Sequence, residues 1–475
     1  MKAFILRKLG DDSSADGVLN DAINIDSLDF LVAAECAFLE GDSPFSEISR
    51  MGNPLQNALE TACFYMGMGA FSEAEQVLLA YADAQKKSGT LSPLVNYYIG
   101  YCKLRMSDAR AKDFFAAASK APVDYCFPFR AEEVDILNSA LEANPSDAHA
   151  HYYLGNLLYF SERKEEGLEH WRKAVSIDGK LAIAWRNIGF ALGRLGKLDE
   201  AISAYEHSIG ANPGNARAYF ELDKLYEAAG KDAKFRLSIL EANAHAVAKR
   251  DDALSRQIEL YIIDGQYSRA LDILNKRHFR VWEGGGQIHA TFVDACMLGG
   301  LEKFKAGDLD GALKLFRLGG TYPRNLEVGR PSDGGSLPQS MFYEASVLER
   351  MGKKAEAMAL YKRVAEFPDR AGADILNFYK ALSWLKLGSK AEADKCAAAL
   401  ESAVRKLMNR KEGLDFFSKF GEQGLKAKQD SNNMFLLGLA ELAKENANLA
   451  KAHFQNALQF NPDNVWAKYY LSTIK

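Results

Sequence analysis

Hydrophobic and small residues recur along the middle of the chain with a period of about 34 residues. At that spacing Leu154 aligns with Ile188, and Gly155 aligns with Gly189. Within each period the apolar positions follow the 3.6-residue repeat of amphipathic helices, and the alternation that is typical of strands is nearly absent. The pattern therefore predicts many consecutive helices, with one extended stretch expected at residues 278–282.

This period is the spacing of the tetratricopeptide repeat, a unit of two antiparallel helices. Residues 182–215 carry the apolar and small residues expected at its fixed places, namely Trp185, Ile188, Gly189, Leu192, Ala201, Tyr205 and Pro213. Small residues allow the two helices to approach closely, and Pro213 ends the second helix. We expect Trp185 and Tyr205 to fill the space between the helices.

Weaker copies of the repeat are marked by a Gly-x-x-x-x-Ala step at the turn into the second helix: Gly69 with Ala74, Gly265 with Ala270, Gly307 with Ala312, and Gly352 with Ala357. A single repeat cannot bury its apolar face alone, so neighbouring repeats must stack. The sequence therefore predicts an all-α fold, a right-handed α-α superhelix (solenoid) of tetratricopeptide-like helix pairs.

Four segments are expected from the quality of the repeats. Residues 1–147 read as degenerate repeats, and 148–230 as the best-formed ones. Residues 231–430 read as irregular repeats with long loops at 278–290 and 319–338, and 431–475 as a C-terminal repeat followed by a capping helix. Gly10 and Ala15 repeat the turn step close to the N-terminus, so the chain is expected to begin inside a repeat.

Charge and cysteine content narrow the classes of partner. With 59 Lys+Arg against 63 Asp+Glu, the net charge of −4 provides no field that favours nucleic acid or an anionic membrane. The six cysteines are scattered without a C-x-x-C pair, which indicates a reducing compartment and no zinc site. No secretory signal and no membrane-spanning apolar run are found, so a cytoplasmic location is expected.

Metal binding, cofactor binding and catalysis are not expected. His149 and His151 are two residues apart on a predicted helix and so point to different faces, and no carboxylate stands four residues after either. The other histidines lie alone, and no set of nucleophile, base and orienting group can be assembled from the spacing. The chain is therefore expected not to be an enzyme.

The first helices of successive repeats line the inner face of such a solenoid, which is its usual binding surface. Aromatic and cationic side chains gather there and suit an extended peptide or a carboxylate. The alternative is an ordinary solvated face. The residues of this predicted groove are Tyr152, Asn156, Tyr159, Arg186, Asn187, Phe190, Arg194, Arg217, Phe220 and Lys224.

A narrower hypothesis compares this groove with eukaryotic tetratricopeptide domains that hold the C-terminal carboxylate of a chaperone through lysines, asparagines and an arginine. Asn156, Asn187 and Arg217 occupy three of those places. Tyr152 stands where a lysine is needed, and Glu221 stands where the arginine is needed. The reversed charge argues against a carboxylate pocket of that kind.

The stretch Trp282-Glu283-Gly284-Gly285 has three interpretations. In the first, it is a corner between repeats, with glycines that allow a tight change of direction. In the second, it is an anion site at the start of the next helix, near Gln287. In the third, Glu283 is a catalytic acid. The corner is favoured, because Glu283 would repel an anion and no second acid lies nearby.

The irregular segments also resemble those of a known family. The resemblance covers most of the chain and is carried by Phe127-Pro128-Phe129-Arg130, residues 150–159, Ala184-Trp185-Arg186-Asn187, residues 221–226, Trp282-Glu283-Gly284-Gly285 and residues 322–326. These resemble the C-terminal tetratricopeptide half of a large bacterial family of unknown function. In that family a β-rich, sugar-processing region precedes the repeats. The chain is therefore expected to be either an excised piece of a longer protein, which the start inside a repeat favours, or a natural member that lost its front half.

Two functions are consistent with these patterns. The first is a non-enzymatic tetratricopeptide scaffold that binds a protein or peptide segment in its concave groove. One candidate partner is the β-rich part of its own parent protein. The alternative is the accessory helical half of a larger bacterial carbohydrate-active protein, contributing a wall or loop to its site.

Overall fold

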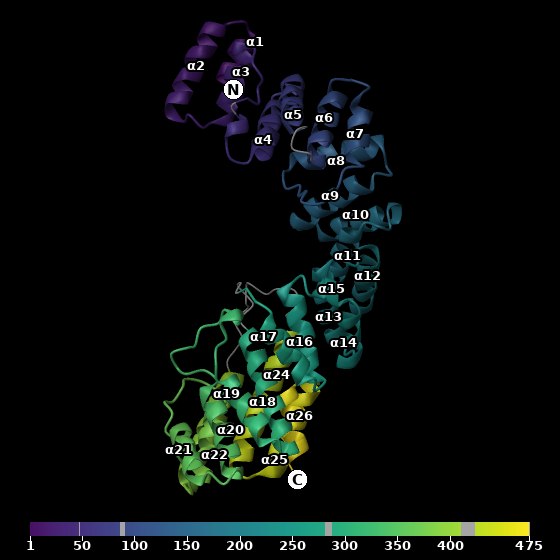
Figure 1. The fold of residues 1–475 in the computed structure, drawn as a ribbon. Coiled ribbons are helices and arrows are strands. Elements are labelled where there is room, and N and C mark those ends of the chain that lie inside the picture. Colours follow the sequence, from purple (N-terminus) through teal and green to yellow (C-terminus); the bar gives the residue numbers. More distant parts are fainter. Residues whose placement is uncertain (47, 86–90, 281–286, 410–422, 475) are drawn as a thin grey trace. The chain divides into compact units, whose positions relative to one another are not determined.

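The computed structural model describes residues 1–46, 48–85, 91–280, 287–409 and 423–474, which form helices and connecting loops and contain no strand. The chain divides into two compact units, Met1–Leu192 and Gly193–Lys475. In each unit consecutive helices pack as antiparallel pairs, and the pairs stack along the chain (Figure 1). The predicted all-α solenoid is therefore confirmed.

The first unit begins with short helices and ends in the best-formed repeats. Its elements are α1 (Lys2–Lys8), α2 (Asp12–Ile25), α3 (Phe30–Glu40), the 3-10 helix η1 (Ile48–Arg50), α4 (Pro54–Gly67), α5 (Phe71–Gln85), α6 (Pro93–Arg105), α7 (Ala111–Ala118), α8 (Glu132–Ala143), α9 (Ala148–Phe160), α10 (Lys164–Ile177) and α11 (Ala182–Arg194), whose last two residues belong to the second unit.

The second unit continues the pairs to the C-terminus. Its elements are α12 (Leu198–Ala211), α13 (Ala216–Ala228), α14 (Ala233–Ala242), α15 (Ala244–Val247), α16 (Asp251–Ile263), α17 (Tyr267–Lys276), α18 (Ile288–Ala306), α19 (Leu309–Gly319), the 3-10 helix η2 (Arg324–Leu326), α20 (Leu337–Arg350), α21 (Lys354–Ala365), α22 (Leu376–Lys386), α23 (Lys390–Met408), α24 (Gln423–Ala443), α25 (Ala447–Phe460) and α26 (Val465–Thr473).

A glycine of the first helix lies against an aromatic ring of the second helix in several pairs. A Cβ atom added to Gly155 in α9 would lie 2.5 Å from the indole of Trp171 in α10. The same clash recurs between Gly100 and Phe115, Gly300 and Phe316, and Gly438 and Phe454, where the distances are 2.5–2.6 Å. The absence of a side chain on these glycines therefore sets how closely the helices of a pair can approach.

The turns between paired helices follow the Gly-x-x-x-x-Ala step. Gly307 and Gly352 adopt the left-handed conformation, with φ of 85° and 82°, which favours glycine over residues with a Cβ. Ala312 and Ala357, five residues later, are fully buried against the first helix. The step therefore marks a real structural unit in the weakly conforming repeats as well.

One expectation about the best-formed repeat was wrong. Tyr205 is fully buried, as predicted, but Trp185 is only half-buried, and its indole N–H donates to the carbonyl oxygen of Gly179 at 3.0 Å. Trp171 in the preceding pair is the buried tryptophan, with 3% exposure. The two indoles differ because Trp171 lies on the second helix, opposite Gly155, whereas Trp185 lies on the first turn of α11.

Two histidines face each other within the α9–α10 pair. The Nδ1 atoms of His151 and His170 are 2.9 Å apart, so one ring donates to the other only while at least one is neutral. Burial lowers the pKa of His151, and the nearby Lys173 adds to that shift. Burial, His151 and Lys173 lower the pKa of His170 to about 4. The folded pair therefore disfavours protonation.

The glycine contact predicts a destabilising substitution. Gly155→Ala should lower the free energy of unfolding by about 1–3 kcal/mol, because the new methyl group collides with Trp171 and overpacks the pair. Gly17→Ala is the control: Gly17 is an exposed glycine of α2 with open space around it, and the change should be neutral or stabilising by up to about 1 kcal/mol. Denaturant unfolding followed by circular dichroism measures both, and equal effects would contradict the close contact.

The histidine pair predicts an acid-sensitive stability. Because both pKa values are lower in the folded state, the stabilisation is complete above the unfolded pKa of about 6.5 and is lost as the pH falls towards about 4. The melting temperature should therefore fall more between pH 7 and pH 5 in the wild type than in His170→Gln. Parallel melting curves for the two proteins across that range would exclude this role for the pair.

Candidate functional site

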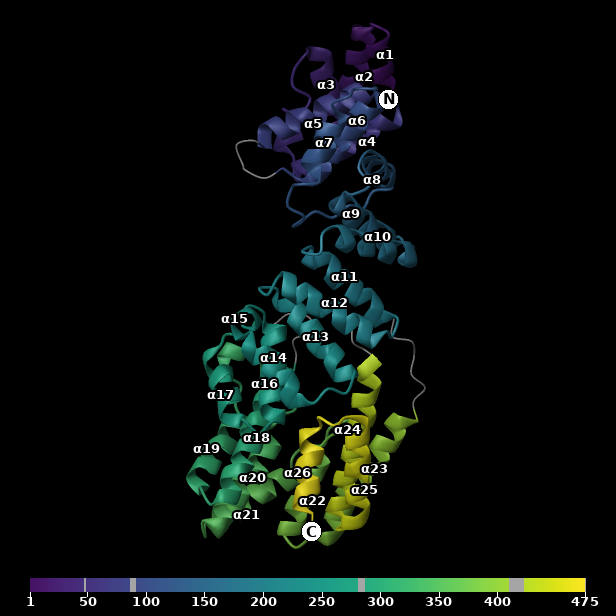
Figure 2. The ribbon, with the colours of Figure 1, turned by 90° about the vertical axis from the view of Figure 1, so that its right-hand side faces the viewer.

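The predicted groove residues of the first unit lie together on α9 and α11. Tyr152, Asn156 and Tyr159 follow one another along α9, and Asn187 and Phe190 lie on α11. All except Tyr152 are partly exposed. We call this set, together with Arg186, the amide–aromatic face. Figure 2 shows α9, α10 and α11 stacked in sequence.

Asn156 links two repeats at the centre of this face. Its side-chain carbonyl oxygen accepts from the indole N–H of Trp171 at 2.9 Å and from the amide Nδ2 of Asn187 at 2.9 Å. These two bonds fix the orientation of both asparagine amides. Because the Nδ2 atom of Asn187 faces Asn156, the side-chain oxygen of Asn187 points away from Asn156.

Aromatic rings flank the asparagines. The ring of Tyr159 lies 4.9 Å from the indole of Trp171 and 6.4 Å from the ring of Phe190, measured between centroids. Burial raises the pKa of Tyr152, while the Asn156 amide and the positive charge of Arg186 oppose that shift. Arg186 is therefore close enough to Tyr152 to place a cation at the edge of this face.

The loop between α7 and α8 carries exposed aromatic residues that sequence reasoning did not assign to a site. Tyr125, Phe127 and Phe129 are 95%, 67% and 53% exposed, and they alternate with the buried residues Cys126 and Pro128. The negative charge of Asp124 in this loop also raises the pKa of Tyr152, so the loop lies beside the amide–aromatic face. The strict alternation of aromatic residues around Pro128 was the available signal.

Glu133 anchors the end of this loop. Its carboxylate accepts from the backbone N–H groups of Phe129 at 2.6 Å and Arg130 at 2.8 Å, and from the phenol of Tyr98 at 3.0 Å. Arg130 in turn lies 4.3 Å from the centroid of the Phe129 ring. The loop is therefore held in a defined conformation although its rings face solvent.

The remaining predicted groove residues belong to the second unit. Arg194 is exposed at the end of α11. Arg217 donates to Glu221 at 3.0 Å, and the other oxygen of Glu221 accepts from Tyr205 at 3.0 Å. Glu221 is thus a buried structural partner, and the reversed charge that argued against a chaperone-tail pocket has a role in packing.

Phe220 and Lys224 face helices of their own unit. The ammonium of Lys224 lies 5.6 Å from the centroid of the Phe220 ring, and Phe220 packs against the hydrophobic core. Burial lowers the pKa of Lys224, as do the nearby cations Arg256 and Lys428. These two side chains therefore lie at an internal contact of the second unit.

An ionic network covers the inner side of α13. Asp223 accepts from Arg236 at 2.9 Å and from Arg256 at 2.7 Å, and Glu227 pairs with Lys428 of α24 at 3.0 Å. Burial alone would raise the pKa of Glu227, but Arg256, Lys428 and Arg236 outweigh it and bring the pKa to about 2. The network therefore joins the first helices of this unit to its last ones.

The long loop at 319–338 is anchored throughout. The side chain of Asn325 donates to the carbonyl oxygens of Leu274 at 2.7 Å and Arg277 at 2.8 Å, and its backbone oxygen accepts from the N–H of Phe279 at 2.8 Å. Tyr322 stacks on His289 with ring centroids 3.9 Å apart. Residues 278–280, the described part of the expected extended stretch, lie outside any helix, and this loop holds Phe279 in place.

The loop candidates Trp282, Glu283, Gly284 and Gly285 lie outside the described residues. Their three interpretations therefore remain hypotheses. The segment that precedes them ends at Arg280, whose backbone N–H donates to Asp251 at 3.1 Å. The helix that follows, α18, has Gln287 at its N-cap position.

Burial suppresses the ionisation of two cysteine thiols. Burial raises the pKa of Cys63 to about 11 and that of Cys102 to about 12, so both thiols remain protonated at neutral pH. Among the described residues, no cluster of three or more His, Cys, Asp or Glu side chains could hold a metal ion. None of the helices described has the length and apolar character needed to cross a membrane.

Comparisons with known proteins agree with the repeat pattern. Residues 182–215 match the family described as tetratricopeptide repeat. A relative from Methanocaldococcus jannaschii, described as TPR repeat-containing protein MJ1428, is 29% identical over 246 residues, which make up 48% of this chain. The match spans 38% of the length of that relative.

The chain also has a low similarity to solved structures. The crystal structure of MamA is 19% identical and covers 41% of this chain and 94% of that one, with a TM-score of 0.23. A tetratricopeptide repeat protein from Parabacteroides merdae is 13% identical and covers 80% of this chain and 98% of that one, with a TM-score of 0.23.

Proposed function

We propose that this tetratricopeptide-repeat chain is a non-enzymatic scaffold that binds an extended protein or peptide segment on the amide–aromatic face of α9 and α11. The proposal rests on residues of the first unit alone. Arg194, Arg217, Phe220 and Lys224 carry no part of it, because they belong to the second unit, where Arg217, Phe220 and Lys224 have packing partners.

The observation that carries the proposal is the bond between Asn156 and Asn187. Their side-chain amides are fixed by the 2.9 Å contacts to each other and to Trp171, yet both residues remain partly exposed. Amides that are oriented in advance can bond to a peptide backbone without a further loss of side-chain entropy. Such contacts suit any sequence, because every peptide has a backbone.

Selectivity would come from the groups around the amides. Phe190 and Tyr159 offer ring surface to apolar side chains of the ligand, and Arg186 offers a guanidinium to a carboxylate. The exposed rings of Phe127 and Phe129 lie in the loop that borders this face. We therefore expect a peptide with mixed apolar and acidic side chains in an extended conformation.

A narrower proposal concerns the source of the segment. The resemblance to a family with a β-rich N-terminal half makes that half of the parent protein one candidate partner. It is supported if a separately expressed β-rich region, encoded in frame upstream, binds the chain in trans. A wild-type chain that ignores this region but binds other peptides would remove the narrower proposal and leave the scaffold intact.

Charge reversal on the amide–aromatic face tests the proposed function. Wild-type protein is applied to an array of random 15-residue peptides, and Arg186→Glu should lose at least about tenfold in affinity for the acidic binders, which is about 1.4 kcal/mol. Lys180→Glu is the matched control, because Lys180 is an exposed lysine in the loop between α10 and α11. Circular dichroism verifies that both variants keep their helices.

The outcome is decisive in either direction. Loss of binding in Arg186→Glu together with retention in Lys180→Glu supports the face on α9 and α11. If no peptide binds, or if both variants bind the same peptides as the wild type, the binding surface is not this face.

A further inference from the structure

The C-terminal helix α26 crosses the first helices of several pairs in its own unit. The indole N–H of Trp466, at its start, donates to the carboxylate of Asp294 in α18 at 2.7 Å. The turn before it is tied down as well, because Asp463 pairs with Arg236 of α14 at 2.7 Å and Asn464 donates to Ser431 of α24 at 3.0 Å. A helix that only capped the last pair would not reach α14 and α18.

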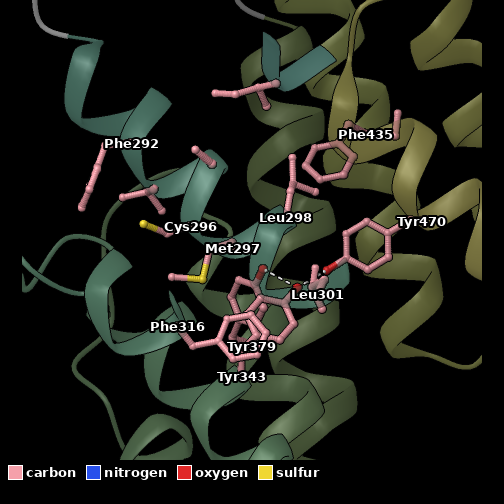
Figure 3. Close-up of a cluster of buried hydrophobic side chains, with 14 of the residues drawn as sticks. Phe292, Cys296, Met297, Leu298, Leu301, Phe316, Tyr343, Tyr379, Phe435 and Tyr470 are labelled. Atoms are coloured by element: carbon pink, nitrogen blue, oxygen red, sulfur yellow. Dashed lines mark hydrogen bonds between the residues drawn. The ribbon is translucent and has the colours of Figure 1, made fainter. Parts of the chain in front are cut away.

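Tyr470 places the other end of α26 in an aromatic cluster. Its phenol lies 3.2 Å from that of Tyr343 in α20, which lies 3.3 Å from that of Tyr379 in α22. Its ring centroid lies 5.7 Å from that of Phe378 and 6.1 Å from that of Phe435. Figure 3 shows Tyr470 meeting this cluster from the side of α26, with the phenol bonds drawn as dashed lines.

These contacts occupy the surface where a solenoid ordinarily binds a partner. α18, α20 and α22 are the first helices of their pairs, and first helices line the inner face. Asp294, Tyr343 and Phe378 of these helices meet α26. We call this surface, with its carboxylate at one end and its aromatic cluster at the other, the covered face.

α26 is short compared with the first of the helices that it covers, α18. It has nine residues, of which only Ala467 and Tyr470 are buried, whereas α18 buries most of its 19 residues. A helix this short is unstable alone in water, so its order depends on the contacts that side chains such as Trp466 and Tyr469 make with the core. A short element with few fully buried residues can open locally at a lower free energy than the core.

A carboxylate lies beneath the indole. Burial raises the pKa of Asp294 to about 6, the charge of Glu259 in α16 contributes, and the bond from Trp466 opposes the shift. At neutral pH the covered face therefore holds a partly buried carboxylate that is stabilised by the indole N–H. A donor supplied by another molecule would serve the same purpose.

We propose that α26 is a displaceable internal ligand and that the covered face binds an amphipathic helix of a partner protein with the same chemistry. That helix would carry an indole in its first turn, to reach Asp294, and a tyrosine one turn later, to enter the aromatic cluster. The site is separate from the amide–aromatic face, so it does not depend on the proposed function.

Hydrogen exchange on the wild-type full chain tests the first half of the proposal. The amides of residues 465–473 should exchange through a local opening, at least about tenfold faster than the slowest amides of α18. If α26 exchanges only together with α18, it is an inseparable part of the core and the proposal is overturned.

Binding in trans tests the second half. The probe is a fluorescein-labelled synthetic peptide with the sequence of residues 461–474. Competition from the attached α26, at a high effective concentration, should keep the peptide off the wild type. The variant Asp463→Ala with Trp466→Ala should bind it at least about tenfold more tightly than the wild type does. Lys468→Ala, a change at an exposed residue of α26, is the matched control.

Two probes set the limits of the result. A peptide with alanine at the position of Trp466 should not bind the variant Asp463→Ala with Trp466→Ala. Fluorescence anisotropy measures the binding of both peptides. Absence of binding by the native-sequence peptide overturns the proposal. A dimer of the variant that excludes the peptide would assign the covered face to a second copy, which also overturns it.

Discussion

The close contact between a glycine and an aromatic ring is the constraint on which the helix pairs depend. The contact of Gly155 with Trp171 lies in the first unit, and that of Gly438 with Phe454 lies in the second. Neither contact leaves space for a Cβ atom on the glycine. Because a bulky ring fills the gap that the missing side chain leaves, each pair has one preferred separation. The stacking of pairs, and with it the position of every inner-face residue, follows from that separation.

Much of the fold could be predicted from the sequence because this constraint is local. Glycine and aromatic residue stand about 16 positions apart within one repeat, so the period of about 34 residues reveals them. Trp185 was misplaced because its repeat position specifies a helix face and a residue type, but not the depth of burial. The Asn156–Asn187 bond was not predicted either, since both residues were chosen as groove positions and the sequence gives no sign of a bond between them.

The second unit diverges further from expectation, for a physical reason. Its groove positions Phe220 and Lys224 face other helices of the unit, and Arg236 pairs with Asp463 across 227 positions of the chain. Such contacts depend on how strongly the stack curves, which is the sum of small rotations at each pair. No single repeat records that sum, so α26 could be predicted as a helix but not as the cover of α18 and α20.

The pairing of Arg236 with Asp463 has a consequence for how the second unit forms. Helix pairs fold through contacts between residues close in sequence, so they close rapidly, whereas a contact of such high sequence separation requires a long loop to close first. During synthesis from the N-terminus, Arg236 and Asp223 emerge and pair long before Asp463 exists. α26 is therefore seated only after the earlier helix pairs of this unit have formed, and until then the nascent protein presents Tyr343 and Phe378 to its surroundings.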